Sequence, residues 1–557
     1  MVMSSSPTQA QSSSQHVNSA SETTPLLNNA PDASDGSTGD IRPWYRRPSP
    51  LHVVLPLVGT VFSYSVSLVP IQQFMLMYLC GRYLAVKEGQ AGTAALGSIL
   101  SSDSINDLPS FAKCREIPDV QALAAKWQMI LTLSTSVPAL LATPLIGALS
   151  DRAGRKPVFF LPILSGLIGS LAILAVAQFD FGLWILILVH LLQGCMGGDL
   201  AIVMITFAYI ADVTTAETRS KVFVTIEALT FISFTIGPYC GGVLTRVLPS
   251  GVIGVVYVTI IGQLLTVVYV TLCLPESLTP PKRSVTDPGL STPAAKPSVL
   301  ATLISFGPVV RVVSKPPRIY LLSLVFITST CVGGIALFFY YASYRFGWDA
   351  YDEGVFMLYA SGTRVFWMMG IATILYKVFA GERHGESETE TSLRKVRLDV
   401  RIVRIGMLVL AGGWILLGLA SASWMVYAVT FWNGIGTLAK PTIRSLLSRS
   451  VPPALQGRLF STIQVTDQVA TIFSNLVFPP IWAASVGGPY PGLFLQIIGG
   501  LFCIAAFIAC AFIKVGDIAN GFHGNIPVSV DAEKGTEEVV LDAETDGGER
   551  DAENAAA

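Results

Sequence analysis

The sequence predicts an all-α membrane protein in which twelve transmembrane helices form two pseudo-symmetric six-helix bundles. Three observations predict this fold class. Of the 557 residues, 52% are hydrophobic and only 13% are charged, with a mean hydropathy of +0.58. Apolar runs occur in two sets of six, and a short motif recurs in both sets. Soluble domains carry about 25% charged residues, so lipid rather than water is expected to surround most of this chain.

Residues 1–50 are predicted to form a disordered cytoplasmic N-tail, since they are rich in Ser, Asn and Pro and contain no apolar signal-peptide core. The first bundle follows over 51–276. Each of its apolar runs exceeds the ~20 residues that cross the hydrocarbon core, and only helices satisfy their own backbone hydrogen bonds in lipid without closing a barrel. The six runs lie near 52–80, 126–149, 157–178, 183–211, 221–247 and 252–274.

A polar stretch rich in Pro, Ser and basic residues, 277–317, is predicted to link the two bundles. The second bundle, 318–515, is predicted by the same argument, and an acidic, disordered C-tail is expected over 516–557. The runs of the second bundle lie near 319–344, 353–379, 402–422, 424–447, 459–484 and 491–515.

The basic residues predict the orientation in the membrane. The connections after Gln178, Ala420 and Ser485 contain no Lys or Arg. Because cytoplasmic loops are enriched in these residues, both termini and the linker are predicted to lie in the cytoplasm. The basic residues that decide this are Arg152, Arg155, Lys156, Arg219, Lys221, Lys377, Arg383, Arg394, Lys395, Arg397, Arg401 and Arg404.

The fifth and eleventh runs begin with related sequences. Lys221-Val-Phe-Val-Thr-Ile-Glu227 opens one, and Arg458-Leu-Phe-Ser-Thr-Ile-Gln464 opens the other. Parallel halves related by an axis along the membrane normal are one known transporter architecture. The recurrence at equivalent helix starts predicts such a repeat.

Four ionisable residues lie deep inside predicted helices: Asp199, Glu227, Arg364 and Asp467. A charge in a spanning helix costs at least ~2.5–3.5 kcal/mol, so each needs a reason to be there. One interpretation is that the four pair with one another and only hold helices together. For Arg364 this interpretation is as good as a functional one. Because the three carboxylates have only one arginine to pair with, at least one carboxylate is left without a partner.

An unpaired carboxylate in a poorly hydrated cavity can bind and release protons near neutral pH, because burial disfavours its charged form. Glu227 is the first choice for proton coupling, since the neutral Gln464 takes its place in the second half. Asp199 and Asp467 are further candidates. The alternative interpretation is that the Glu227 carboxyl group has only a structural role.

Uncharged polar residues accompany these charges. Most such side chains cross-link helices through hydrogen bonds, and a minority contact solute. We expect the substrate path to include Gln193, Asn433 and Gln464 together with Arg364. The aromatic residues within 338–344 are typical of an interfacial belt and less often of a cavity wall.

The connection between the second and third runs reads Gly147-Ala-Leu-Ser-Asp151-Arg152-Ala-Gly154-Arg155-Lys156-Pro157. The first glycine permits close helix contact and Gly154 a tight turn. Asp151 is expected to accept hydrogen bonds from a neighbouring helix N-terminus, while the basic residues hold the loop in the cytoplasm. This order of residues favours a latch that locks one conformation over a loop that only sets topology.

This connection resembles the signature loop of the major facilitator superfamily. Within it, the chain resembles the solute carrier family 46 and proton-coupled folate transporter group, and more loosely the tetracycline-resistance class of drug:proton antiporters. The folate-transporter resemblance is carried by Gly197-Gly198-Asp199, Ala211-Asp212-Val213-Thr214, Arg219-Ser220, Glu227, Pro441-Thr-Ile-Arg444, Leu447-Ser448, Gln456-Gly457 and Leu459-Phe460-Ser461. Gly237-Pro238 and Gly241-Gly242 are like the antiporters' glycine-proline element, which permits packing and bending.

The resemblance covers roughly 50–515 and implies the major facilitator fold. It also implies proton coupling at Glu227, an effect of Arg444 on proton and substrate binding, and gating by Asp151 and Arg152. The chain departs from the folate transporter in having no histidine in its seventh predicted helix.

Two further features concern the surroundings of the chain. Cys80 and Cys114 bracket the long loop predicted outside the cytoplasm, and either form a disulfide or stay free. Glu22-Thr-Thr-Pro-Leu26-Leu27 resembles an acidic dileucine signal that a sorting adaptor would bind, and a chance match is the alternative. We therefore expect the plasma membrane or a vacuolar or endolysosomal membrane.

Together these features predict a monomeric secondary transporter that moves a small organic solute with protons by alternating access, as a symporter or, alternatively, as an efflux antiporter. A non-transporting nutrient sensor on a transporter fold is the alternative from another class. The sequence has no nucleophile elbow, phosphate loop or metal-spaced His/Cys cluster, so we expect no enzyme activity, metal or cofactor. The expected partners are solute, protons and membrane lipid, and not nucleic acid.

Overall fold

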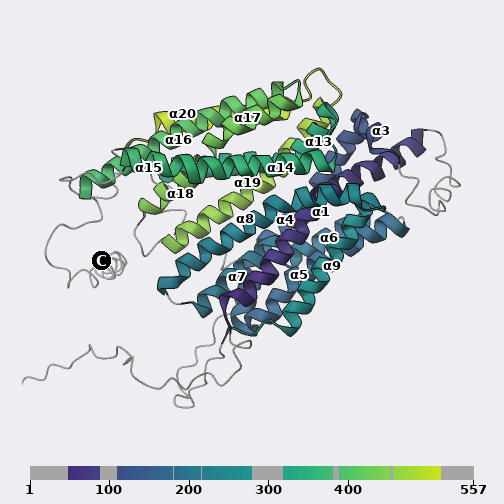
Figure 1. Cartoon of the computed structure of the whole chain (residues 1–557), viewed down its shortest axis with the longest axis horizontal. Coiled ribbons are helices and arrows are strands. Elements are labelled where there is room, and N and C mark those ends of the chain that lie inside the picture. Colours follow the sequence, from purple (N-terminus) through teal and green to yellow (C-terminus); the bar gives the residue numbers. More distant parts are fainter. Residues whose placement is uncertain are drawn as a thin grey trace, which may run out of the picture. The chain divides into compact units, whose positions relative to one another are not determined.

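The computed structural model describes residues 48–87, 109–179, 181–214, 216–278, 318–380, 388–451 and 456–515. Within these ranges the chain is almost entirely helical and contains no strand. Every predicted run falls in one helix or in consecutive helices, which confirms the all-α fold class (Figure 1). Ten helical segments of the described ranges are long and apolar enough to cross a membrane.

The first six predicted runs correspond to the helices that we call the first half. The fourth run is divided between two of them. Their bounds are α1 Pro50–Lys87, α3 Phe111–Arg115, α4 Pro118–Ala153, α5 Arg155–Phe179, α6 Trp184–Cys195, α7 Gly198–Val213, α8 Ala216–Val247 and α9 Gly251–Leu272.

The remaining runs correspond to the second half, in which the seventh, eighth and tenth runs are divided. A π-helical turn, η3, interrupts the eighth run between α14 and α15. The bounds are α12 Arg318–Gly333, α13 Ile335–Phe346, α14 Ala350–Val365, η3 Phe366–Ile371, α15 Ala372–Ala380, α16 Glu388–Leu419, α17 Ser423–Gly436, α18 Ala439–Arg449, α19 Gln456–Ser485 and α20 Leu493–Ala511.

Local sequence determines where α14 begins. The Asp349 carboxylate accepts hydrogen bonds from the backbone N–H groups of Tyr351 and Asp352, both at 2.9 Å. The Asp352 carboxylate accepts in return from the N–H of Asp349 at 3.2 Å. This capping box satisfies N–H groups that have no partner inside the helix. It therefore holds the start of α14 at a defined residue.

The fourth and tenth runs are interrupted at corresponding places of the two halves. Between α6 and α7, Gly197 and Gly198 adopt φ angles of 89° and 51°, which residues with a side chain rarely adopt. Between α17 and α18, a tight turn places the N–H of Thr437 3.2 Å from the carbonyl three residues before it. Interrupted helices at corresponding positions point to binding sites. Asp199 and Lys440, which follow the two breaks, are thus site candidates.

The larger buried apolar cluster contains residues of both halves, among them Phe74, Tyr341 and Trp482. A second cluster, which includes Phe159 and Ile210, lies within the first half. The aromatic residues of 338–344 belong to the larger cluster, where the side chains from 338 to 341 are at most 3% exposed. The interfacial belt is therefore wrong for these four residues, because close packing against the other helices buries them.

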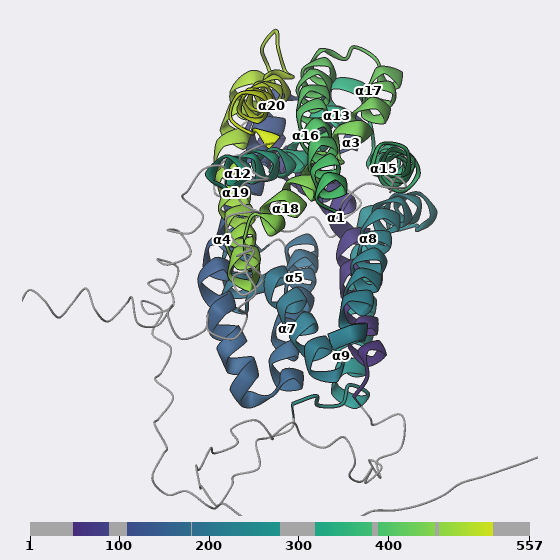
Figure 2. The same cartoon turned by 90° about the vertical axis from the view of Figure 1, so that its left-hand side faces the viewer.

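The two halves contact each other through α8 against α14 and through α4 against α19. In Figure 1, α8 and α14 meet near α13 and diverge towards α15, and Figure 2 shows α4 beside α19. We call the end at which Arg246 of α8 meets the start of α14 the gate end. The opposite end of α8, near which α5 begins at Arg155, is called the latch end.

A disulfide joins Cys80 near the end of α1 to Cys114 in α3, with the two Cα atoms 5.6 Å apart. The sequence left this pairing open, and the structure resolves it. The bond spans 34 positions of the chain and ties α3 to the gate end of α1.

The disulfide is expected to stabilise the folded chain by about 3–4 kcal/mol, because closing a loop of this length lowers the conformational entropy of the unfolded chain. The double variant Cys80→Ser/Cys114→Ser should therefore unfold at a lower temperature in detergent than the parent, and reductant should lower the midpoint of the parent but not that of the double variant. The control is Cys331→Ala, a buried free cysteine, whose midpoint should remain sensitive to reductant. Equal midpoints for parent and double variant would contradict the prediction.

Candidate functional site

At the latch end, Arg155 joins three helices of the first half. Its guanidinium lies 2.6 Å from the Asp151 carboxylate of α4 and 2.9 Å from the Asp212 carboxylate near the end of α7. It also donates to the Ser150 hydroxyl at 3.0 Å. The Arg155 side chain is largely buried, so these partners replace the water that a guanidinium would otherwise bind.

Glu276, which follows α9, caps the N-terminus of α5. Its carboxylate accepts hydrogen bonds from the backbone N–H groups of Arg155 at 2.8 Å and Lys156 at 3.1 Å. A carboxylate at a helix N-terminus also interacts favourably with the helix dipole. Gly154 lies against this group at φ 102°, where a Cβ atom would come within 2.6 Å of Glu276 Oε2.

The structure corrects the role expected of Asp151. We predicted that Asp151 accepts hydrogen bonds from a helix N-terminus, but Glu276 does so and Asp151 pairs with the Arg155 side chain. The reason is geometric: Asp151 lies in the last turn of α4 and one turn before Arg155, so the guanidinium reaches it first. Among the other loop residues, Arg152 is exposed, and the Lys156 ammonium donates to the Thr271 carbonyl at 2.9 Å.

Gly147 lies where α4 meets α7. A Cβ atom there would be 3.2 Å from the sulfur of Met204. The contacts described here for the latch residues are made within the first half, so in this conformation the latch holds α4, α5, α7 and the end of α9 together.

Near the middle of the second half, one carboxylate meets two cations. Asp467 of α19 accepts a short hydrogen bond from Arg444 and lies 3.7 Å from the Lys440 ammonium, both on α18. Ser329 of α12 donates to Asp467 and accepts from Lys440 at 3.0 Å. We call Asp467, Lys440, Arg444 and Ser329 the central cluster. Asp467 is thus not the unpartnered carboxylate that the sequence analysis looked for.

Arg364, the third cation, lies in the last turn of α14 directly before η3. Its charge is close enough to oppose that of Lys440, and its guanidinium lies 6.0 Å from the centre of the Phe231 ring on α8. Among the described residues no carboxylate forms an ion pair with Arg364. The purely structural interpretation, in which it pairs with a carboxylate, therefore finds no support in this conformation.

Glu227 lies one turn before Phe231 on α8, so the two side chains share a face of that helix. This places Glu227 on the face of α8 that Arg364 approaches. The Glu227 side chain is exposed in this conformation, so the dehydrated surroundings expected for it are not present here. Gln464, its counterpart in the second half, is exposed as well.

Two of the polar residues expected along the substrate path contact neighbouring helices instead. The Gln193 amide donates to the Ser165 carbonyl at 2.9 Å, which links α6 to α5. Asn433 of α17 packs against Gly413 of α16, where a Cβ atom would come within 1.7 Å of the amide oxygen. Gln193 therefore has the helix-linking role of most polar residues in membrane helices, whereas the Asn433 Oδ1 atom is buried and accepts no hydrogen bond from the described residues.

Some predicted site residues lie outside the described part of the structure. Asp199 is in α7, but its side chain is not among those described. The sorting motif with Glu22, Leu26 and Leu27 also lies outside the described residues. Both remain predictions.

At the gate end, several polar contacts join the two halves. Arg246 of α8 lies 2.8 Å from Asp349 and 3.7 Å from Asp352, and its guanidinium is 4.0 Å from the centre of the Tyr351 ring. The Ala350 N–H donates to Gln73 of α1 at 3.2 Å. A further hydrogen bond runs from Arg115 of α3 to the Gly347 carbonyl. These contacts close the gate end in this conformation.

Glycines let the backbones of the two halves touch at the gate end. A Cβ atom at Gly242 would lie 2.6 Å from the Ala350 carbonyl oxygen, and one at Gly354 would lie 2.6 Å from the Pro238 carbonyl oxygen. Two further glycines of α8 lie equally close to α1. A Cβ atom at Gly237 would come within 1.9 Å of the Ser65 hydroxyl, and one at Gly241 within 2.0 Å of the Val66 carbonyl oxygen. The predicted glycine-proline element therefore lies at the contact of α8 with α1 and α14.

The charge of Asp349 follows from its surroundings. Burial opposes ionisation, but the hydrogen bond from Arg246 and those from the backbone N–H groups of Asp352 and Tyr351 outweigh it, so the pKa of Asp349 lies below its ordinary value. A lowered pKa means that this contact stabilises the closed gate above the ordinary Asp value of about 3.9 and weakens only as the pH falls further. The Arg246 contact is thus charged throughout the physiological range.

Sequence reasoning missed several residues of these sites. Lys440 lies in a hydrophobic run beside the quoted Pro441-Thr-Ile-Arg444, and a positive charge within that run was the available signal. Glu276 and Arg246 lie at helix ends, where charged residues are common and carry no signal by themselves. Asp399 of α16, which is 1% exposed and 3.4 Å from Arg449, was also missed.

Comparison with known proteins gives a consistent result. The sequence profile described as Major Facilitator Superfamily matches residues 92–383. Over 88% of its length the chain is 23% identical to the MFS-type transporter avaJ of Aspergillus versicolor, covering 94% of that protein. It is 25% identical to the class C tetracycline resistance protein of Escherichia coli, with 67% of the chain and 83% of that protein covered.

A third relative is the lysosomal proton-coupled steroid conjugate and bile acid symporter of Gallus gallus, 24% identical over 76% of the chain and 86% of that protein. Among solved structures, a D-xylose-proton symporter superposes with a TM-score of 0.56, covering 85% of the chain and 98% of that structure at 15% identity. This structural likeness concerns the fold.

The glycine contact at the gate end yields a matched test. Gly242→Ala is expected to destabilise the chain by ~1–3 kcal/mol, because the added methyl group overlaps backbone atoms that cannot move aside. Gly500→Ala is the control, since a Cβ atom there has no neighbour within 4 Å and the change should be neutral or slightly stabilising. Thermal unfolding in detergent measures both, and equal midpoints for the two variants would rule out the tight contact.

Proposed function

The chain belongs to the major facilitator superfamily and is a secondary membrane transporter, and we propose that it carries a small organic anion together with protons. In this proposal the two halves rock about a central site and expose it to each side of the membrane in turn. The gate end faces away from the cytoplasm, as the distribution of basic residues indicates.

The observation that carries the proposal is the excess of positive charge around the central cluster. Lys440 and Arg444 share a single carboxylate of the second half, Asp467, and Arg364 adds a third positive charge close enough to act on Lys440. The Nε atom of Arg444 is buried and has no hydrogen-bond acceptor. A buried donor without a partner is costly, and a carboxylate or sulfate group of a solute would supply the missing acceptor.

Glu227 gives this site a means of coupling to protons. It lies on the same face of α8 as Phe231, which Arg364 contacts. When Glu227 is ionised it offsets part of the positive charge, and when it is protonated the site attracts an anion more strongly. Proton and anion then bind cooperatively, which is the requirement for symport. Asp467, held by two cations, is better suited to positioning them than to exchanging protons.

The location in the cell is proposed as an endolysosomal or vacuolar membrane. The motif with Glu22, Leu26 and Leu27 resembles a signal for a sorting adaptor, and one relative is named as a lysosomal symporter. The solute is therefore expected to leave that compartment with protons. Lipid surrounds the helices, and the chain is proposed to work as a monomer.

Efflux by proton antiport is the second candidate. The relatives named as tetracycline resistance proteins and the packing of Gly237 and Gly241 against α1 support it. Antiport requires that solute and proton compete, so that ionised Glu227 favours solute binding. The sign of the proton effect on solute binding therefore distinguishes the two mechanisms.

Anion binding is tested by thermal unfolding of purified protein with four probes: an organic sulfate, an organic carboxylate, a neutral sugar and an organic cation. The two anions should raise the midpoint, because a ligand of the folded state stabilises it. Lys440→Gln should weaken their binding by about tenfold or more, whereas Lys377→Gln, an exposed lysine on α15, should not. Stabilisation by the cation alone would refute an anionic solute.

Proton coupling is tested with Glu227→Gln in proteoliposomes that are given an anion bound in the previous experiment. The variant should lose accumulation driven by a pH gradient but keep part of its solute exchange, because exchange needs no net proton movement. Glu116→Gln, a change at an exposed carboxylate, serves as the control. If the Glu227 variant accumulates solute as well as the parent, Glu227 has no part in coupling.

A further inference from the structure

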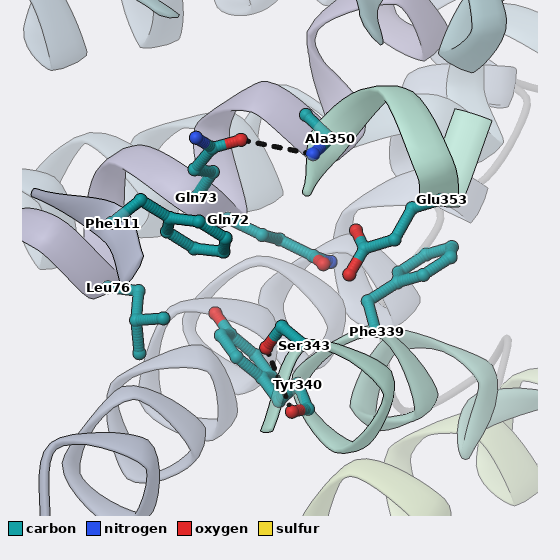
Figure 3. A pocket seen from close by; sticks show the side chains of 9 residues that line it. All are labelled: Gln72, Gln73, Leu76, Phe111, Phe339, Tyr340, Ser343, Ala350 and Glu353. Atoms are coloured by element: carbon teal, nitrogen blue, oxygen red, sulfur yellow. Dashed lines mark hydrogen bonds between the residues drawn. The ribbon is translucent and has the colours of Figure 1, made fainter. Parts of the chain in front are cut away.

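A small pocket lies at the gate end, between α1, α3, α13 and the start of α14 (Figure 3). Glu353 of α14 and Gln72 of α1 lie in it, 5% and 6% exposed, and their side chains point towards each other. Phe339 and Tyr340 form its wall on the α13 side. None of these residues is part of the central cluster.

No cation lies beside Glu353 in the part of the chain that the structure describes. Among the described residues its carboxyl group forms no ion pair and no side-chain hydrogen bond. The charged groups that act on it are Asp349 and Asp352 of its own helix, and Arg246 of α8 is bound to those two. From the other helices it faces the neutral Gln72 and the Tyr340 hydroxyl of α13. An enclosed carboxylate with only like charges nearby carries a large desolvation cost, which protonation removes.

Gln72 provides an independent observation. Its Oε1 atom is buried and has no hydrogen-bond donor. An ionised carboxylate can only accept hydrogen bonds, whereas a protonated one has an O–H to donate. Protonation of Glu353 therefore supplies the donor that Gln72 Oε1 lacks, and it satisfies both groups at once.

The pocket exists because the gate end is closed. Glu353 follows the capping box of α14 by one residue, and the same turn is held to the first half through Gln73 and Arg246. Separation of α14 from α1 would admit water to Glu353 and remove the reason for its protonation. The Arg246 contact itself stays charged, as argued above, so it contributes equally across the physiological pH range.

We propose that Glu353 is a proton-binding site that takes up a proton when the gate end closes and releases it when the gate end opens. This site is distinct from Glu227 and lies in the half that Glu227 does not belong to. The inference deepens the proposed proton coupling and rests on it. It makes closure of the gate end itself dependent on protons.

The test measures how often the gate end opens. Ser343→Cys places a thiol in the pocket, where Ser343 is 3% exposed, in a chain whose free cysteines are replaced by alanine and whose Cys80–Cys114 disulfide is kept. The replaced residues are Cys195, Cys240, Cys273, Cys331, Cys503 and Cys510. A membrane-impermeant sulfonated maleimide is applied from the gate side at pH 5.5 to 8. Ser250→Cys, at an exposed turn, corrects for the pH dependence of the thiol.

With Glu353 present, the corrected labelling rate should rise with pH by up to about tenfold per pH unit, the limit for one coupled proton. Glu353→Gln should label slowly at every pH, because the amide mimics the protonated acid. Asp352→Asn should label faster than the parent, since it weakens the Arg246 contact and the capping box of α14, and its pH dependence should move to lower pH because one like charge near Glu353 is removed. Pocket labelling that does not change with pH, or that still changes in Glu353→Gln, overturns the proposal.

A replacement variant and a Na⁺ control complete the test. If Glu353→Gln does not fold, Gln72→Met replaces it and should shift the pH dependence to lower pH, because the protonated acid loses its acceptor. An unshifted dependence overturns the proposal. A response of labelling to Na⁺ at fixed pH, without a response to pH, also overturns it, in favour of a cation site.

Transport of the same proteins separates this inference from the proposed function. Solute accumulation driven by a pH gradient together with pH-independent pocket labelling refutes Glu353 alone. Pocket labelling that depends on pH and on Glu353, without any pH-driven transport, supports the proton site and refutes the proposed symport.

Discussion

A charge placed among apolar helices must be paired, protonated or held in reach of water, because the membrane interior and the packed protein offer it no other solvation. Two of the charges among the described residues satisfy this constraint by pairing. Arg155 is buried and paired with Asp151 and Asp212. Asp467 lies between two cations. Glu353, enclosed without a cation, is the exception, and the exception is where we infer a proton.

The same constraint separates the roles of the two ends of the molecule. At the gate end, glycine contacts bring the backbones of α8 and α14 together, and the exposed Arg246 joins the halves through the partly exposed Asp349. Exposed ion pairs contribute little, at most about 1 kcal/mol, so they can break and reform as the halves move. At the latch end, Arg155 and Glu276 hold helices of one half together. A stiff half and a weakly bonded contact between halves are what rigid-body rocking needs.

The central cluster lies next to the interrupted tenth run, and Arg364 lies next to a π-helical turn in the eighth. Such irregular turns are often found at functional sites. Lys440 and Arg444 lie one turn apart on α18, so they share a face of that helix and both reach Asp467. In the proposed function, this excess of positive charge attracts an anionic solute, and ionisation of Glu227 changes the strength of that attraction.

The amino-acid sequence by itself determined the helices, their order and the family, because apolar runs of spanning length and the loop from Gly147 to Pro157 are local signals. It also marked Asp199, Glu227, Arg364 and Asp467, since a charge in an apolar run is visible without a structure, and the family resemblance added Arg444. Only the tertiary structure decided the partners: Asp467 with Lys440, Arg155 with Asp212, Glu276 with the start of α5, and Gln72 opposite Glu353. Those pairs join residues far apart in the chain, and which charges meet depends on how helices rotate and tilt against one another. That information resides in the packing of whole helices and not in any one segment.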